Sequence, residues 1–160
     1  MSARKAFLAI ALASTVLIGT TGCSFSHDVR SLQPYAPSDG VQVDVGHLAL
    51  RNAFILTVNG QTALFASIVN SGNEDIDATI QYDDPMTGAK SNVDFPVFAQ
   101  EKLDLGYNGN PPVNLNIETA PGKTVGIYLL GANKGSTLLD VPVLDATNPL
   151  YAPYADLIGQ

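Results

Sequence analysis

The sequence predicts an all-β domain, folded as an antiparallel β-sandwich. Between residues 41 and 145, short runs of apolar residues follow one another, and several alternate with polar residues. Turn signals interrupt these runs roughly every 8–12 residues, which is the spacing of all-β sandwiches. We find no amphipathic helix of ordinary length. About seven such strands favour an immunoglobulin-like or cupredoxin-like form, but the lack of Trp and of a Cys pair excludes an antibody-type core.

The first half of the domain contains the clearest strand signals. The run "VQVDV" at 41–45 alternates apolar and polar residues, and so does "IDATIQY" at 76–82. Between them, Asn59 and Gly60 separate two apolar runs, "HLALRNAFILTV" and "QTALFASIVN". Because both central residues of a type I′ turn need positive φ, this dipeptide predicts a tight hairpin.

The second half predicts further strands. In "NVDFPVF", Pro96 favours an edge strand or a bulge, since proline cannot donate a ladder hydrogen bond. The stretch "DDPMTGAKS" before it is expected to be a loop. The remaining strands are expected within "EKLDLG" at 101–106, "VNLNI" at 113–117, "APGKTVGIYLLGA" at 120–132 and "STLLDVPVLD" at 136–145.

The N-terminus has the features of a lipoprotein signal. Arg4 and Lys5 precede an apolar stretch over 6–18, followed by small residues up to Gly22 and Cys23. The apolar stretch falls short of the roughly 20 residues that cross a bilayer as a helix, and a basic start before it is typical of an export signal. The only cysteine of the chain stands where a bacterial lipoprotein receives its diacylglycerol. We therefore expect Cys23 to anchor the protein to the outer face of the cell membrane.

These signals divide the chain into four parts. The segment 24–40 lacks an apolar period and carries two prolines and several serines, which is typical of a tether. About 137 residues follow Cys23, enough for one domain with a real core. We expect a signal peptide at 1–22, a lipidated N-terminus and tether at 23–40, a β-sandwich at 41–145 and a C-terminal tail at 146–160.

The charge balance restricts the partners. The chain has 8 basic and 15 acidic residues, a formal net charge of −7. Removing the signal with its two basic residues would make the charge −9. Such a surface repels nucleic acid and anionic headgroups, so we expect no nucleic-acid partner and attachment through lipid rather than through a basic face.

No motif indicates catalysis or a cofactor. The two histidines, His27 and His47, cannot supply a three-histidine zinc site, and neither lies near a candidate nucleophile. Acidic residues gather in "NSGNEDID", but their spacing does not match the twelve-residue calcium loop. Adjacent acids such as Asp83 and Asp84 are expected in a solvated turn. We predict no enzyme, no cofactor and no metal ligand.

The C-terminal stretch "NPLYAPYADLI" combines prolines with apolar and aromatic residues. Exposed tyrosines give large contact area at small entropic cost, which suits recognition. Leu150, Tyr151 and Tyr154 are therefore candidate partner-binding residues. The alternative, equally open, is that these tyrosines pack back on the sandwich.

Several motifs together resemble a known family. "YAPSDGVQVDVGHLALRNAFIL", "ALFASIVNSGNEDID", "APGKTVGIYLL" and "VPVLD", behind the lipoprotein signal, resemble the LpqE-type lipoproteins of actinobacteria. Those proteins are distantly similar to periplasmic copper chaperones of the cupredoxin-like PCu(A)C family. This resemblance implies the fold and the location. It would also imply copper bound through histidine and methionine, yet the only methionine after the signal is Met86, and no histidine has a methionine beside it.

Two functions follow from these observations. The first is a lipid-anchored, non-catalytic binding or adaptor module of the cell envelope, whose partner is an envelope protein or a wall polymer. The second is a metal-handling module, similar to the copper chaperones, with altered ligands. The scarcity of soft ligands favours the first.

Overall fold

The computed structural model describes residues 38–131 and 135–159, which belong to one compact unit, Ala36–Gln160. The predicted signal peptide, Cys23, His27 and most of the predicted tether lie outside the described residues. Nine strands follow in order: β1 Val41–Val45, β2 Leu48–Val58, β3 Gln61–Asn70, β4 Ile76–Asp84, β5 Ala89–Val97, β6 Lys102–Leu105, β7 Val113–Leu115, β8 Thr124–Leu130 and β9 Ser136–Asp145. A 3₁₀ helix, η2, covers Ala152–Leu157. Among the described residues, no helix has the length and apolar character needed to cross a membrane.

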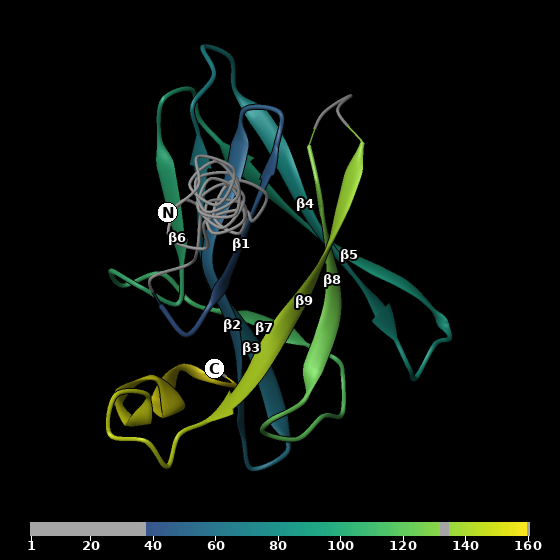
Figure 1. Cartoon of the computed structure of the whole chain (residues 1–160), viewed down its shortest axis with the longest axis vertical. Helices are drawn as coiled ribbons and strands as arrows, with labels where there is room; N and C mark the ends of the chain where they lie inside the picture. The colour runs from purple at the N-terminus through teal and green to yellow at the C-terminus, as the bar shows by residue number, and fades with distance from the viewer. Residues whose placement is uncertain (1–37, 132–134, 160) are drawn as a thin grey trace, which may run out of the picture. The chain divides into compact units, whose positions relative to one another are not determined.

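The strands form a single curled sheet whose two halves face each other, in the order β5-β4-β8-β9-β2-β3-β6 (Figure 1). β1 pairs with β2. β6 and β7 both pair with β3, β6 along residues 66–69 and β7 along residues 62–64. The predicted all-β sandwich is therefore confirmed, as is the edge position of Pro96, because β5 ends the sheet. The Asn59-Gly60 hairpin is also confirmed, with positive φ at both residues and Val58 paired with Gln61.

β9 joins the two halves. Its first part pairs antiparallel with β8 as far as Pro142, which faces Thr124. Its last three residues, Val143 to Asp145, run parallel to β2 beside Ile55 to Thr57. Among the described strands, β2 and β9 are therefore the one parallel pair of the sheet. The alternation of apolar residues along a single strand does not reveal such a pairing.

Apolar side chains fill the space between the layers. This core includes Leu50, Ile55, Leu64, Ile68, Ile80, Ile127, Leu129 and Val141, all fully buried. The middle parts of β2 and β3 are buried on both faces, since a second cluster lies on their outer side around Phe54 and Phe65. Burial on both faces explains why "AFIL" and "ALFA" read as continuous apolar runs instead of alternating.

The β4–β5 connection is tighter than expected. β4 continues to Asp84, which pairs with Ala89, so most of the expected loop is strand. Asp84 is buried, and its carboxylate accepts hydrogen bonds from the backbone N–H of Met86 and from the side chain of Asn116. The expectation of a solvated turn is wrong for Asp84, because the turn folds back over its side chain.

A buried asparagine holds one end of the sandwich together. The Asn70 side chain donates to the carbonyl oxygens of Glu74 at 2.8 Å and Val97 at 3.0 Å. Its own oxygen accepts from the backbone N–H of Gly72 at 2.9 Å. Asn70 is 0% exposed and lies where β3 ends and the loop to β4 begins. Its side chain therefore gives three backbone groups hydrogen-bond partners at a place where water does not reach Asn70.

Replacing Asn70 with Ala should destabilise the domain by about 2–4 kcal/mol, because buried backbone groups would lose their partners. Urea unfolding measures this change. Asn92→Ala is the matched control, because the Asn92 side chain is exposed and accepts a hydrogen bond from the side chain of Gln81 at the surface. The free energy of unfolding of this variant should stay within about 0.5 kcal/mol of that of the unmodified protein. Equal stability of the two variants would contradict the structural role of Asn70.

Candidate binding site at the C-terminal aromatic cluster

Five aromatic side chains gather on the outer face of β2 and β3. We call them the aromatic cluster: Phe54, Phe65, Tyr107, Tyr151 and Tyr154. Phe54 and Phe65 face each other across the β2–β3 ladder and stack, with ring centroids 5.3 Å apart and planes 3° apart. Stacked and edge-to-face aromatic pairs stabilise beyond their buried area, so the cluster forms a firm platform.

Two backbone features place the platform. The β2–β3 register shifts between Arg51 and Phe54, and Asn52 in this bulge has a φ of 48°. After the bulge, Phe54 points outward while Ile55 points into the core. Gly106, with a φ of +81°, lets the next loop approach closely: a Cβ there would lie 2.1 Å from the Phe65 ring. Tyr107 can therefore reach the cluster only because residue 106 is glycine.

Side chains of the C-terminal segment cover the platform. The segment is the yellow stretch at the lower left of Figure 1. Tyr151, Tyr154 and Leu157 are three residues apart, so the 3₁₀ turn brings them to one side. Tyr154 meets Phe65 edge-on at 5.5 Å, and Tyr151 lies 5.2 Å from Phe54. Ile158, 8% exposed, completes the packing. The helical turn spans Ala152–Leu157.

The predicted binding residues thus lie together but differ in exposure. Tyr151 and Tyr154 are half-buried against the cluster, whereas Leu150 is 71% exposed. Of the two alternatives for these tyrosines, packing on the sandwich is what the structure has. Binding of a partner by all three residues stays a prediction.

A pocket of about 310 Å³ opens between these residues. Its lining combines ring faces with polar groups: Ser38, Asp39, Asn52, Phe54, Tyr107, Leu150, Tyr151 and Tyr154. A second hollow, of about 530 Å³, lies against the other sides of Tyr107 and Tyr154. The two tyrosines therefore form a wall that a ligand could contact from either side.

Hydrogen bonds fix two of the three tyrosines. Asn52 donates from its side-chain nitrogen to the Tyr107 hydroxyl at 3.0 Å, and the Tyr151 hydroxyl donates to Asp39. Within the described residues, the Tyr154 hydroxyl has no hydrogen-bond partner, and the Tyr107 hydrogen has no acceptor. No buried side-chain nitrogen or oxygen among the described residues lacks a partner, so the unbonded Tyr154 hydroxyl is open to solvent or a ligand.

Tyr107 and Tyr151 stay protonated at neutral pH. Burial raises the pKa of Tyr107 strongly, and the nearby Tyr154 and Tyr151 add to the effect. Burial, together with the hydrogen bond to Asp39, raises the pKa of Tyr151 to about 12. The Tyr107 and Tyr151 hydroxyls therefore offer neutral groups rather than anions.

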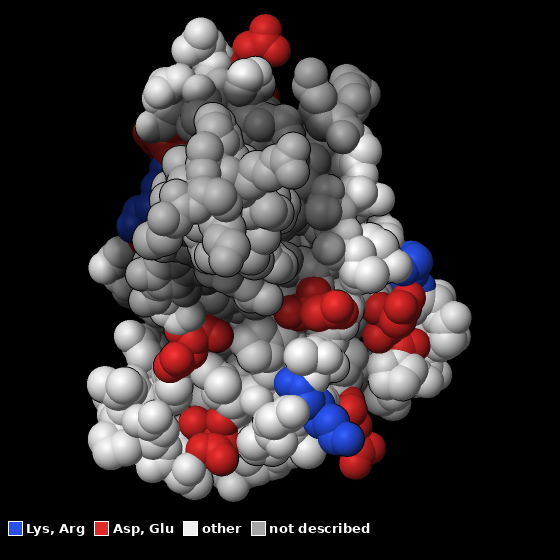
Figure 2. Space-filling model, viewed as in Figure 1, with Lys and Arg blue, Asp and Glu red and all other residues white. Residues whose placement is uncertain are grey.

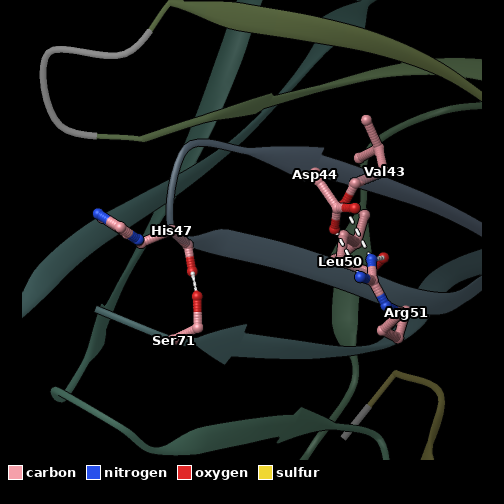
Figure 3. Close-up of polar contacts among 6 residues, drawn as sticks. All are labelled: Val43, Asp44, His47, Leu50, Arg51 and Ser71. Atoms are coloured by element: carbon pink, nitrogen blue, oxygen red, sulfur yellow. Dashed lines mark hydrogen bonds and ion pairs between the residues drawn. The ribbon is translucent and has the colours of Figure 1, made fainter. Parts of the chain in front are cut away.

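The other residues considered from the sequence do not form a site. His47 is exposed in the turn before β2, and Figure 3 shows its ring pointing away from the other side chains drawn. Its carbonyl oxygen accepts from the backbone and the hydroxyl of Ser71. Arg51 forms an ion pair with Asp44 at 2.6 Å and donates to the Val43 carbonyl, which ties β1 to β2 (Figure 3). These contacts are structural.

No metal centre is evident in the part of the chain that is described: no three His, Cys, Asp or Glu side chains converge there. In the acidic loop between β3 and β4, the Asp75 carboxylate accepts a hydrogen bond from the backbone N–H of Ala99. A larger hollow of about 1390 Å³, lined by Gln61, Asn114, Asn116 and others, is wide and mixes polar with apolar groups, and Tyr82 is the one aromatic residue in its described lining. The aromatic pocket is therefore the stronger candidate.

The tyrosines on the tail were found from the sequence, but their partners were not. Phe54, Phe65, Tyr107 and Asn52 come from distant segments, and only the tertiary fold brings them to the tail. The signal that could have found the two phenylalanines is the continuous apolar run in each strand, which requires a cover on both faces.

Comparison with known proteins finds distant similarity to solved structures. No protein-family model matches the chain, and no curated protein matches it. The "apo PmoF2 PCuAC domain" is 14% identical, covers 66% of this chain and 95% of that chain, and has a TM-score of 0.46. The "Apo PCuAC domain from PmoF1" is 18% identical, covers 64% and 98%, and has a TM-score of 0.44.

A third solved structure, the "Copper-bound PCuAC domain from PmoF2", is 14% identical, covers 66% of this chain and 98% of that chain, and has a TM-score of 0.45. Membership of the LpqE-type lipoproteins remains a prediction.

Deleting residues 147–160 should lower the melting temperature by several degrees, because Phe54 and Phe65 would lose their cover. Full burial of a large apolar side chain is worth about 1.5–3 kcal/mol, and the segment contributes several partly buried ones. Thermal unfolding followed by circular dichroism measures the effect. Leu150→Ala is the control and should melt unchanged, since this side chain is exposed. A truncated protein that melts normally would mean that the tail does not stabilise the domain.

Proposed function

We propose that this protein is a lipid-anchored, non-catalytic binding module on the outer face of the cell membrane, and that its aromatic pocket takes up a neutral sugar ring of a wall polymer. One observation carries the proposal: three tyrosines converge on one pocket, and the hydroxyls of two of them have hydrogen-bonding capacity left over.

The chemistry of the pocket suits a sugar ring. Small-molecule sites combine apolar and aromatic walls with a few polar groups that fix orientation, in volumes from about 300 Å³. The faces of Tyr107 and Tyr154 can pack against the C–H face of a ring, and their hydroxyls can bond its hydroxyl groups. The hydrogen bond from Asn52 holds the Tyr107 ring in place, and the hydrogen bond to Asp39 holds the Tyr151 ring.

Charge selects a neutral ligand. The chain carries a net charge of −7, and Asp39 lies in the lining of the pocket. On the face shown in Figure 2, acidic side chains are spread over the described surface and basic ones are few. Phosphate-rich or otherwise anionic polymers would be repelled, whereas uncharged saccharides would not.

The alternative of metal handling finds little to support it in the described residues. Met86, the one soft ligand there, is 80% exposed on the β4–β5 turn. No three His, Cys, Asp or Glu side chains converge among the described residues. Copper binding remains a question for titration, because thioether and imidazole ligands can act only when they meet at one point.

The membrane anchor rests on the sequence. Cys23, behind the export signal, is the proposed lipid attachment point. Two or more acyl chains give stable anchoring, whereas one gives marginal binding. The anchor would hold the pocket close to the wall polymers outside the membrane.

Replacing Cys23 with Ala should shift the protein from the membrane fraction to the soluble fraction, because the thiol that accepts the lipid is lost. Fractionation followed by immunoblotting measures the shift. Ser24→Ala, one residue on, is the control and should stay membrane-bound. If the Cys23 variant stays fully in the membrane fraction, the protein is held there by something other than lipid on Cys23.

Replacing Tyr154 with Phe should weaken binding of neutral wall saccharides about fivefold, since the ring stays and one hydrogen bond worth about 1 kcal/mol is lost. Calorimetry with soluble neutral oligosaccharides released from the cell wall measures this. Tyr128→Phe, a half-exposed tyrosine on β8 under Lys90, should bind as the unmodified protein does.

Absence of saccharide binding by the unmodified protein, or equal binding by both variants, would count against the proposed site. A tight one-to-one Cu(I) complex that survives a competing chelator would instead support the metal-handling alternative.

A further inference from the structure

The curled sheet does not close. Its two ends are β5 on one side and β6 with β7 on the other, and within the described residues neither end pairs with a further strand. β5 is 9 residues long and contributes a full ladder to β4 alone. Figure 1 shows its hairpin with β4 projecting from the body of the sandwich. An unpaired edge of this length is a template for another strand.

An apolar hollow of about 370 Å³ lies between these two ends. Val93 and Phe95 of β5, both half-buried, line one side. Leu103, Leu105 and Val113 line the other. The hollow therefore exposes part of the core between the layers at the place where the sheet is open.

The backbone of β5 is oriented for pairing. Pro96 has no N–H, and prolines are tolerated in an edge strand where the N–H would face away from the neighbouring strand. Because the orientation of the backbone groups alternates along a strand, Asn92 and Asp94 share the orientation of Pro96 and direct their N–H and C=O groups to the open side. The side chains between them, Val93 and Phe95, face the hollow.

The charge of this edge indicates the occupant. Asp77 and Asp94, neighbours on the outer face of β4 and β5, form no ion pair among the described residues, and neither does Glu101 after β5. The nearby lysines are already engaged: Lys90 with Asp83 at 3.1 Å and Lys102 with Asp104 at 2.8 Å. A basic segment would complement this edge. A second copy of the chain would instead bring like charges together.

We propose that an extended segment of a partner protein adds to the sheet beside β5. Its alternate apolar side chains occupy the hollow, and the Lys or Arg residues between them face Asp77 and Asp94. Main-chain hydrogen bonds supply affinity in such strand addition, and the pockets for alternate side chains supply specificity. The hollow beside β5 shares no lining residue with the aromatic pocket, so an adaptor could hold a wall saccharide and a protein at the same time.

A matched pair of variants tests the proposal in the full-length protein in detergent micelles. Asn92→Pro removes one outward N–H and blocks strand addition. Asn92→Ala removes the same side-chain bond to Gln81 but keeps the N–H. The probe is a fluorescent nine-residue peptide of alternating Val and Lys. Fluorescence anisotropy should show binding that is at least tenfold weaker for Asn92→Pro and within twofold of the unmodified protein for Asn92→Ala, while both variants keep the normal melting temperature.

Two control peptides separate strand addition from simple attraction. A peptide of the same composition with its valines grouped together, and one of alternating Val and Glu, should bind at least tenfold more weakly. Equal binding of the grouped peptide, equal binding by the two Asn92 variants, or no binding of the Val-Lys peptide would overturn the proposal. So would concentration-dependent dimerisation that Asn92→Pro abolishes, since the edge would then serve a second copy.

The same variants keep the two proposals distinguishable. Asn92→Pro should bind neutral wall saccharides as the unmodified protein does, and Tyr154→Phe should bind the Val-Lys peptide unchanged. Loss of both activities in either variant would show that the two surfaces do not act separately.

Discussion

The two layers depend on β9, the strand that pairs in both. As far as Pro142 it belongs to the ladder with β8, and from Val143 it runs parallel to β2. The change occurs at a proline, which cannot donate to a ladder. Val143 then exchanges hydrogen bonds with the turn before β8: its N–H donates to Lys123, and its carbonyl accepts from Gly122. A single strand thus connects both halves of the core.

The path of β9 decides what lies on the outside of the sandwich. Because the strand ends beside β2, the residues that follow it can cover Phe54 and Phe65. The aromatic cluster consequently serves stability and the candidate site with the same side chains. Joining the layers through β9 also leaves β5 and β6 as the two ends of one sheet, so the open edge is the other consequence of the same connection.

Several carboxylates in this acidic domain accept hydrogen bonds from the backbone and from neighbouring side chains. The backbone N–H of Met86 and the side chain of Asn116 lower the pKa of Asp84 despite its burial. At Asp104, burial works to raise the pKa, but hydrogen bonds from Lys102, Ser67 and Asn108 outweigh it and lower the pKa. Thr147 lowers the pKa of Asp145. Acidic residues that gather in turns therefore do not by themselves indicate a metal site, because such carboxylates can accept hydrogen bonds from nearby backbone and side-chain groups.

The sequence by itself determined the all-β class, the Asn59-Gly60 hairpin and the edge position of Pro96, because turn residues and alternation act over a few neighbouring residues. It also drew attention to Leu150, Tyr151 and Tyr154. Only the tertiary structure decided that β9 pairs parallel with β2, that Asp84 is buried and that the tyrosines meet Phe54, Phe65 and Tyr107. These features join segments far apart in the chain, and the free energy of such contacts depends on packing that no local pattern encodes.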